Sequence, residues 1–175
     1  MISCLRFLLS PKYTPKTDHH IIAPFAHWFS HQRTNAHLFR LISFPDVLPR
    51  ASPTFNVFQG DFMSLSPPTN TYDYIVTLFF IDTSLNVIST LRQIHTLLRP
   101  GGTWINLGPL LWTSGSQAKL ELSLDEVLLV AEDIGFRFEE GQNLRRRTIE
   151  CEYTADKESM MTWIYRAEFW VARKL

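Results

Sequence analysis

The chain has 175 residues, of which 45% are hydrophobic and 19% charged, enough for one buried core in a single globular domain. Its 17 basic and 17 acidic residues cancel, so no net charge favours nucleic acid or an anionic membrane as a partner. Two distant cysteines, Cys4 and Cys151, exclude a disulfide scaffold, and the apolar residues 1–9 are too few for a membrane span, so we expect a soluble protein of the cytoplasm or nucleus.

The first part of the chain, residues 1–53, has little regular pattern. Prolines, five of the six histidines and only short apolar runs lie between Pro11 and Pro53, a composition typical of loops. We expect one short helical stretch near residues 23–30 and no independent fold. The main domain is therefore predicted to occupy residues 54–175.

Three strands and one helix are predicted next. Residues 55–61 form a short apolar run that ends at glycine and an acid, and residues 72–81 are aromatic and β-branched nearly throughout. Both runs predict strands, the second one buried on both faces of a sheet. A helical period over residues 83–98 and an apolar run over 103–107 then predict a right-handed crossover between parallel strands.

The rest of the chain is also predicted to contain helices and strands. Ser123 and Glu126 have the spacing of a helix capping box, and Gly135 is expected to end that helix. Beyond it we expect a helix that begins near Ser159 and strands at residues 136–139, 148–153 and 167–172. The whole pattern predicts an α/β fold.

Polar residues follow three of the predicted strands. Asp61 follows the first strand, Asp82 the second, and residues 106–112 the third. Ligands in open α/β sheets bind outside the carboxyl ends of the strands, because the crossover helices leave a crevice there. We therefore expect both carboxylates to face one crevice. Each acid also has a structural explanation, since Asp61 can close a turn and Asp82 can cap the following helix.

Several motifs, in this order along the chain, resemble one family. Gly60-Asp61-Phe62, Tyr72-Asp73-Tyr74-Ile75 and Leu98-Arg99-Pro100-Gly101-Gly102 look like the third to fifth strands of class I methyltransferases. From about Ile21 onward the chain more narrowly resembles the carnosine N-methyltransferase family, through Phe44-Pro45-Asp46-Val47, Phe79-Phe80-Ile81-Asp82-Thr83, the stretch Trp104–Leu111 and Tyr153-Thr154. The resemblance implies a partial Rossmann-like sheet with helices on both faces, and transfer of a methyl group from S-adenosylmethionine to the imidazole of carnosine, which gives anserine.

The resemblance also implies roles for individual residues. Asp61 would accept a hydrogen bond from the adenine amino group of the cofactor, Phe62 would pack against the adenine ring, and Leu78 would adjoin the cofactor. Asp82 would be the catalytic group that meets the imidazole, either accepting its N–H or stabilising charge as the ring nitrogen attacks the methyl group. Further substrate-binding positions are Thr113, Tyr153 and Tyr165.

The sequence departs from the family pattern in two places. Thr113 stands where the family has a histidine, which would remove a substrate contact or a proton acceptor. The seven glycines form no G-x-G motif after any strand, so the usual cradle for the methionine and ribose is missing. We expect that cradle, with the first strands of the sheet, to lie upstream of Met1 in a longer enzyme, which would leave unpaired strand edges here.

Two functions stay open. The first is an S-adenosylmethionine-dependent N-methyltransferase that acts on a small imidazole-containing molecule, without a metal, nucleic acid or membrane. The second is a non-catalytic remnant that binds no cofactor and serves as an interaction module, in a homo-oligomer or with a full-length relative. Binding of S-adenosylmethionine distinguishes the two.

Overall fold

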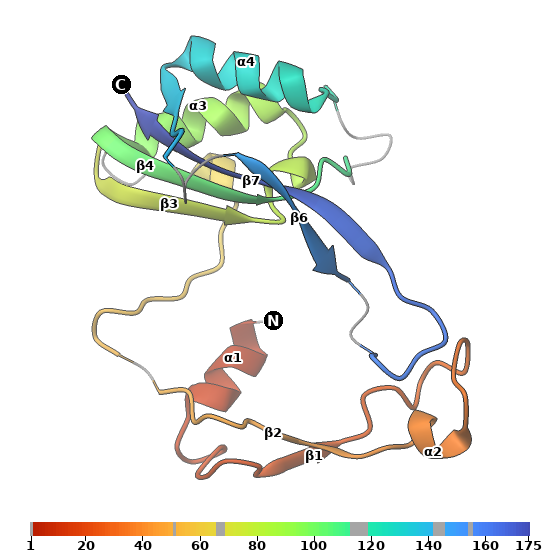
Figure 1. Ribbon diagram of the computed structural model, residues 1–175. Coiled ribbons are helices and arrows are strands. Elements are labelled where there is room, and N and C mark those ends of the chain that lie inside the picture. Colours follow the sequence, from red (N-terminus) through yellow and green to blue (C-terminus); the bar gives the residue numbers. More distant parts are fainter. Residues whose placement is uncertain (1, 51, 66–68, 113–118, 142–145, 154–155) are drawn as a thin grey trace. The chain divides into compact units, whose positions relative to one another are not determined.

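The computed structural model describes residues 2–50, 52–65, 69–112, 119–141, 146–153 and 156–175 (Figure 1). Contacts divide the chain into two compact units. Unit 1 comprises Met1–Gly60 and Thr154–Trp163, and unit 2 comprises Asp61–Tyr153 and Ile164–Leu175. Residues 154–163 thus cluster with unit 1, although they lie within the range that we expect for the methyltransferase part.

The described residues of unit 1 form four short elements. They are helix α1 (Ile2–Leu9), strand β1 (His20–Ile22), helix α2 (Asn35–Leu38) and strand β2 (Ile42–Phe44), and β1 pairs antiparallel with β2. The expected helix near residues 23–30 is wrong, because this stretch consists of turns and irregular backbone. Its aromatic residues and histidine are weak helix formers, and so short a stretch does not repay the cost of helix nucleation. No helix in the described parts of the chain is long and apolar enough to cross a membrane.

Unit 2 is built on a five-stranded sheet. Its strands are β3 (Tyr72–Leu78), β4 (Leu98–Gly108), β5 (Phe136–Phe138), β6 (Arg147–Glu152) and β7 (Ile164–Lys174). The strand order is β3-β4-β7-β5, and β6 also pairs with β7. Strands β3 and β4 are parallel and helix α3 (Val87–Leu97) connects them, which confirms the predicted strand, helix and strand.

The predicted capping box opens helix α4 (Leu124–Ile134). The Glu126 carboxylate accepts a hydrogen bond from the Ser123 backbone N–H at 2.8 Å, and the Glu126 backbone N–H donates to Ser123 Oγ at 3.4 Å. Gly135 ends the helix with a left-handed φ of 112°, a conformation that glycine adopts without a steric cost. Both ends of α4 are therefore as the sequence predicts.

Helices α3 and α4 lie on the same face of the sheet (Figure 1). Their apolar side chains pack with Trp104, Phe136 and Trp170 of the strands in one buried core. The Trp104 indole N–H donates to Thr77 Oγ1 at 2.8 Å, and the Thr77 hydroxyl donates to Asn106 Oδ1, also at 2.8 Å. These buried polar groups are thus hydrogen-bonded within the core, as interior polar groups generally are.

Strand β3 is shorter and less buried than predicted. It ends at Leu78 rather than at residue 81, and Tyr74, Val76 and Leu78 are 67%, 56% and 61% exposed. The expected burial on both faces is wrong because β3 is an edge strand, which pairs only with β4 in the described part of the chain. In addition, α3 and α4 both cover the other face of the sheet, not the face that carries Tyr74, Val76 and Leu78.

Two other expected elements are wrong. Residues 55–61 form no strand, because a strand needs a neighbour to satisfy its backbone groups and this stretch has no such ladder. The helix expected from about Ser159 is replaced by turns and irregular backbone. Strand β7 begins earlier than predicted, since Ile164 and Tyr165 pair with residues of β6.

Candidate functional site

Asp82 lies just beyond the carboxyl end of β3, in a short 3-10 turn, η2 (Ile81–Thr83). The residue is only 5% exposed, and its Oδ2 accepts a hydrogen bond from the backbone N–H of Leu111 at 3.1 Å. Leu111 lies in the loop that follows β4, so Asp82 links the ends of two parallel strands. Burial raises the pKa of Asp82, although the hydrogen bond from Leu111 opposes this shift.

Asp82 does not cap the helix that follows it. The N-cap of α3 is Asn86, whose Oδ1 accepts a hydrogen bond from the Ser89 backbone N–H at 3.2 Å. The structural explanation that the sequence allowed for Asp82 is therefore wrong. A buried carboxylate that holds one loop N–H keeps further lone pairs for another donor.

Asp61 opens a second 3-10 turn, η1 (Phe62–Ser64). Its carboxylate is exposed and accepts hydrogen bonds from the Met63 backbone N–H at 3.0 Å and the Ser64 hydroxyl at 2.9 Å. The turn-closing role is thus present, and it leaves lone pairs for an external amino group.

The η1 turn packs beside the connection from β3 to α3. The Phe62 ring meets the Phe80 ring edge to face, with centroids 5.2 Å apart. Met63 Sδ accepts a hydrogen bond from the hydroxyl of Thr90 in α3 at 3.7 Å. Both η1 and η2 contact α3, so the segments that carry Asp61 and Asp82 meet at the carboxyl end of β3.

Three aromatic rings form a row at the same end of the sheet. The Phe79 ring lies 5.7 Å from the Tyr165 ring, which lies 5.1 Å from the Tyr153 ring, and both pairs are T-shaped. The structure therefore brings the two predicted substrate tyrosines together and adds Phe79, which sequence analysis missed. Phe79 follows β3 directly and has a φ of 48°. An aromatic residue with positive φ is uncommon, and no local sequence signal announces it.

Gly108 lies close to the backbone of Phe79, the residue with positive φ. A Cβ at Gly108 would lie 3.1 Å from both Cα and N of Phe79, whose N–H donates to the Leu107 carbonyl at 2.8 Å. We expect Gly108→Ala to cost about 1–3 kcal/mol of unfolding free energy, because backbone rather than a flexible side chain must move. Urea unfolding measures this cost. Gly141→Ala is the control, since its Cβ would meet nothing within 4 Å, and equal effects of the two variants would contradict the prediction.

The other predicted positions divide into three cases. Leu78 is 61% exposed on the uncovered face of β3. Thr113 lies outside the described residues. Asn106 is fully buried, and its Nδ2 donates to the Glu168 carbonyl at 3.2 Å, so it holds β4 to β7.

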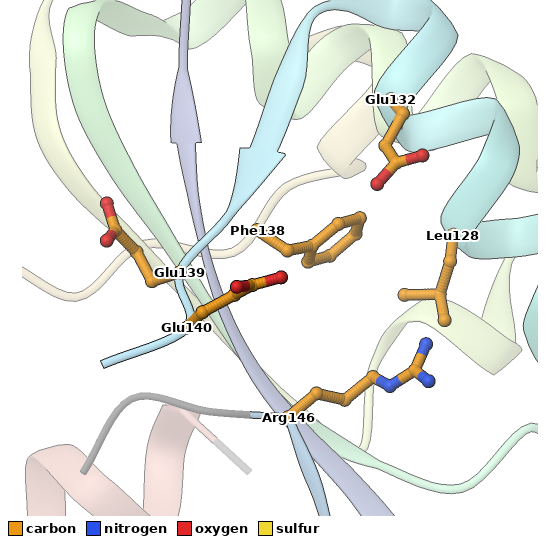
Figure 2. A pocket seen from close by; sticks show the side chains of 6 residues that line it. All are labelled: Leu128, Glu132, Phe138, Glu139, Glu140 and Arg146. Carbon is orange, nitrogen blue, oxygen red and sulfur yellow. The ribbon is translucent and has the colours of Figure 1, made fainter. Parts of the chain in front are cut away.

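A cavity of about 610 Å³ lies elsewhere in unit 2, and Figure 2 shows the side chains around it. Glu139, one of its three glutamates, pairs with Arg173 at 2.6 Å. The complete lining is Leu128, Glu132, Phe138, Glu139, Glu140 and Arg146. None of these is a predicted site residue, so the cavity and the strand-end site are separate features. Among the described residues, no group of three or more His, Cys, Asp or Glu side chains could hold a metal ion.

Comparison with known proteins connects this geometry to a family. The fold resembles the crystal structure of a SAM-dependent methyltransferase from Methanosarcina mazei, with a TM-score of 0.52, 14% sequence identity and coverage of 73% of this chain and 71% of that one. The model of the carnosine N-methyltransferase family matches residues 1–175. The chain belongs to the carnosine N-methyltransferase family. This confirms both the expected family and the class I methyltransferase fold, whose cofactor is S-adenosylmethionine.

Curated relatives of this family are considerably longer. Carnosine N-methyltransferase of Rattus norvegicus is 37% identical over 165 residues, which is 91% of this chain and 40% of the rat protein. The Schizosaccharomyces pombe enzyme is 33% identical over 172 residues, 87% of this chain and 45% of that protein. The chain therefore spans less than half the length of these relatives.

Proposed function

We propose that this chain provides the methyl-acceptor side of an S-adenosylmethionine-dependent N-methyltransferase that acts on a small imidazole-containing molecule such as carnosine. The observation that carries the proposal is the buried Asp82 carboxylate at the end of β3, held by the Leu111 N–H at 3.1 Å. The aromatic row of Phe79, Tyr165 and Tyr153 begins three residues before it. Strand ends of this kind are where open α/β sheets bind ligands.

The chemistry of Asp82 suits an imidazole acceptor. One imidazole nitrogen needs its lone pair free to attack a methyl group, so the other must carry the N–H, and a carboxylate is a good acceptor for it. Because burial raises the pKa of Asp82, its carboxylate is a stronger base than an exposed aspartate and can take the proton that the ring loses. The faces of nearby aromatic rings attract positive charge as the imidazole becomes cationic.

The residues present fit one end of the cofactor. The Asp61 carboxylate has acceptor capacity left for the adenine amino group, and Phe62 offers a half-buried ring beside it. The bound cofactor supplies an electrophilic methyl group on sulfur. No G-x-G motif follows a strand in this sequence, so we propose that the contacts to the methionine and ribose come from a segment outside these 175 residues.

Calorimetric titration tests whether this chain binds the methyl acceptor but does not hold the cofactor by itself. We expect the chain to bind carnosine in a saturable way, and Asp82→Asn to weaken that binding at least about tenfold, the loss of one charge-assisted hydrogen bond. Asp61→Asn is the matched control, because Asp61 is assigned to the cofactor and should leave carnosine affinity unchanged. No saturable heat is expected with S-adenosylmethionine at concentrations up to the order of hundreds of micromolar. Carnosine binding that Asp82→Asn leaves intact would refute the proposal.

A second function, that of a non-catalytic interaction module, is favoured by the edge of β3. In the described part of the chain this strand pairs only with β4, and it exposes Tyr74, Val76 and Leu78. Unpaired edges with apolar side chains are typical sites of strand addition. Light scattering that shows a stable oligomer, together with no carnosine binding, would favour this alternative over the enzyme.

A further inference from the structure

Asn106 is a fully buried polar side chain of β4, the strand that lies between β3 and β7. Its Oδ1 accepts a hydrogen bond from the hydroxyl of Thr77 in β3 at 2.8 Å, and its Nδ2 donates to the backbone carbonyl of Glu168 in β7 at 3.2 Å. One amide therefore bonds to both neighbours of β4. An apolar side chain would fill the same place without the cost of taking an amide out of water, so packing alone does not require an asparagine here.

The two strands that this amide joins carry rings of the proposed acceptor site just beyond their pairing with β4. The pairing of β3 with β4 ends one residue before Phe79. The pairing of β7 with β4 begins at Glu168, and Tyr165 comes three residues before it. The Phe79 and Tyr165 rings nevertheless meet, with centroids 5.7 Å apart. Because strands open most readily at their ends, backbone pairing with β4 alone holds neither ring firmly.

The hydrogen bonds of Asn106 lie close to both of these strand ends. Thr77 comes two residues before Phe79, and Glu168 is the first residue of β7 that pairs with β4. The Thr77 hydroxyl also accepts the indole N–H of Trp104 at 2.8 Å, which ties the network to the core. A displacement of one strand would leave a buried donor or acceptor unpaired, so the network favours a single arrangement of the three strands.

We propose that Asn106 is a positioning residue for the methyl acceptor: by joining β3 to β7 through β4, it holds the Phe79 and Tyr165 rings at the spacing that the acceptor needs. This inference rests on the proposed function, in which the aromatic row lies beside the imidazole. Asn106 acts through the rings and does not touch the acceptor, since its side chain is fully buried. A small displacement of the rings is costly because binding and alignment depend on geometry.

Calorimetric titration of carnosine into three variants tests this role. Asn106→Leu removes both hydrogen bonds at similar size, while the Thr77 hydroxyl can still donate to the Ile105 carbonyl, 3.4 Å away. Thr77→Val removes the hydroxyl and keeps the shape of the side chain. We expect these two variants to weaken carnosine binding about tenfold. Thr77→Ser is the matched control: it keeps the hydroxyl and should keep the affinity, although loss of the buried methyl group lowers stability in urea unfolding.

NMR of the chain without ligand distinguishes loss of positioning from loss of folding and from failure of the proposed function. Through-space contacts between the Phe79 and Tyr165 ring protons report the ring pair. The indole signal of Trp112, which donates to the Leu122 carbonyl at 3.1 Å, reports the fold of unit 2. We expect the leucine and valine substitutions to weaken the ring contact and to leave the Trp112 signal in place.

The outcomes separate the two hypotheses. If the wild type binds no carnosine but both substitutions still break the ring contact, the proposed function is wrong and the role of Asn106 in placing the rings stands. A ring contact that survives both Asn106→Leu and Thr77→Val would overturn the inference. The same holds if the wild type binds carnosine and both variants bind it equally well.

Discussion

Asp82→Asn is expected to slow methyl transfer strongly and at the same time to stabilise the fold. Asparagine keeps the size of the side chain and can still accept the Leu111 N–H through Oδ1, so the loop after β4 should stay in place. The variant lacks the basic carboxylate, and the loss of a positioned proton acceptor lowers rates about 10²–10⁴-fold. The measurement is methyl incorporation into carnosine, detected by mass spectrometry, by whichever complete assembly shows activity with the wild-type chain.

The stability change follows from the raised pKa of Asp82. A carboxyl group whose pKa is higher in the folded than in the unfolded state stabilises the fold in its protonated form, and it costs stability once ionised. The free energy of unfolding should therefore fall as pH rises from the ordinary value of 3.8 through the raised pKa of Asp82. In Asp82→Asn this contribution to the pH dependence is absent, so the variant should be the more stable protein at neutral pH.

Urea unfolding across that pH window checks the prediction. Asp73→Asn is the control, because Asp73 is exposed and pairs with the exposed Arg99, and such surface pairs contribute little. A wild type that is more stable than Asp82→Asn at neutral pH would show that the Asp82 carboxylate serves the fold rather than the reaction. The expected result, a wild type that is more active but less stable than the variant, is a common trade-off at functional sites.

Trp104→Ala is expected to have the largest effect on the fold of unit 2. Trp104 is fully buried, and its ring centroid lies 5.2 Å from that of Phe136 and 5.3 Å from that of Trp170. Removing so large a buried side chain costs about 3–5 kcal/mol, because the surrounding residues collapse only partly into the cavity. The Thr77 hydroxyl also loses the indole N–H that donates to it. Since whole domains have only about 5–15 kcal/mol of stability, we expect unit 2 to be largely unfolded or close to it.

Near-ultraviolet circular dichroism and urea unfolding measure this loss. Tyr74→Ala provides the comparison, because Tyr74 is an aromatic residue of the neighbouring strand that is 67% exposed. Exposed substitutions away from special features usually change stability by no more than about 0.5 kcal/mol. A Tyr74→Ala variant as unstable as Trp104→Ala would mean that the outer face of β3 is buried in the protein in solution.

The parts of the fold that short stretches encode were predictable from the sequence. Helix α4 is defined by a capping box four residues long and by a glycine at its end, and α3 by apolar residues that recur with the helical period on one face. The position of Asp82 after a strand was predictable for the same reason. One wrong prediction concerns a stretch whose structure depends on a partner: residues 55–61 have a strand-like composition but pair with no strand in the described part of the chain.

The sequence by itself determined the parallel pair β3 and β4 with its connecting helix, the capped helix α4, and the family to which the chain belongs. Only the tertiary structure decided that Asp82 is held by Leu111, that Phe79 completes the aromatic row, and that Asp156 pairs with Arg40. Capping and hydrophobic periodicity act over a few residues, and the sequence displays them directly. These three contacts instead join residues that are 29, 86 and 116 positions apart, and which distant groups meet depends on how the whole chain packs.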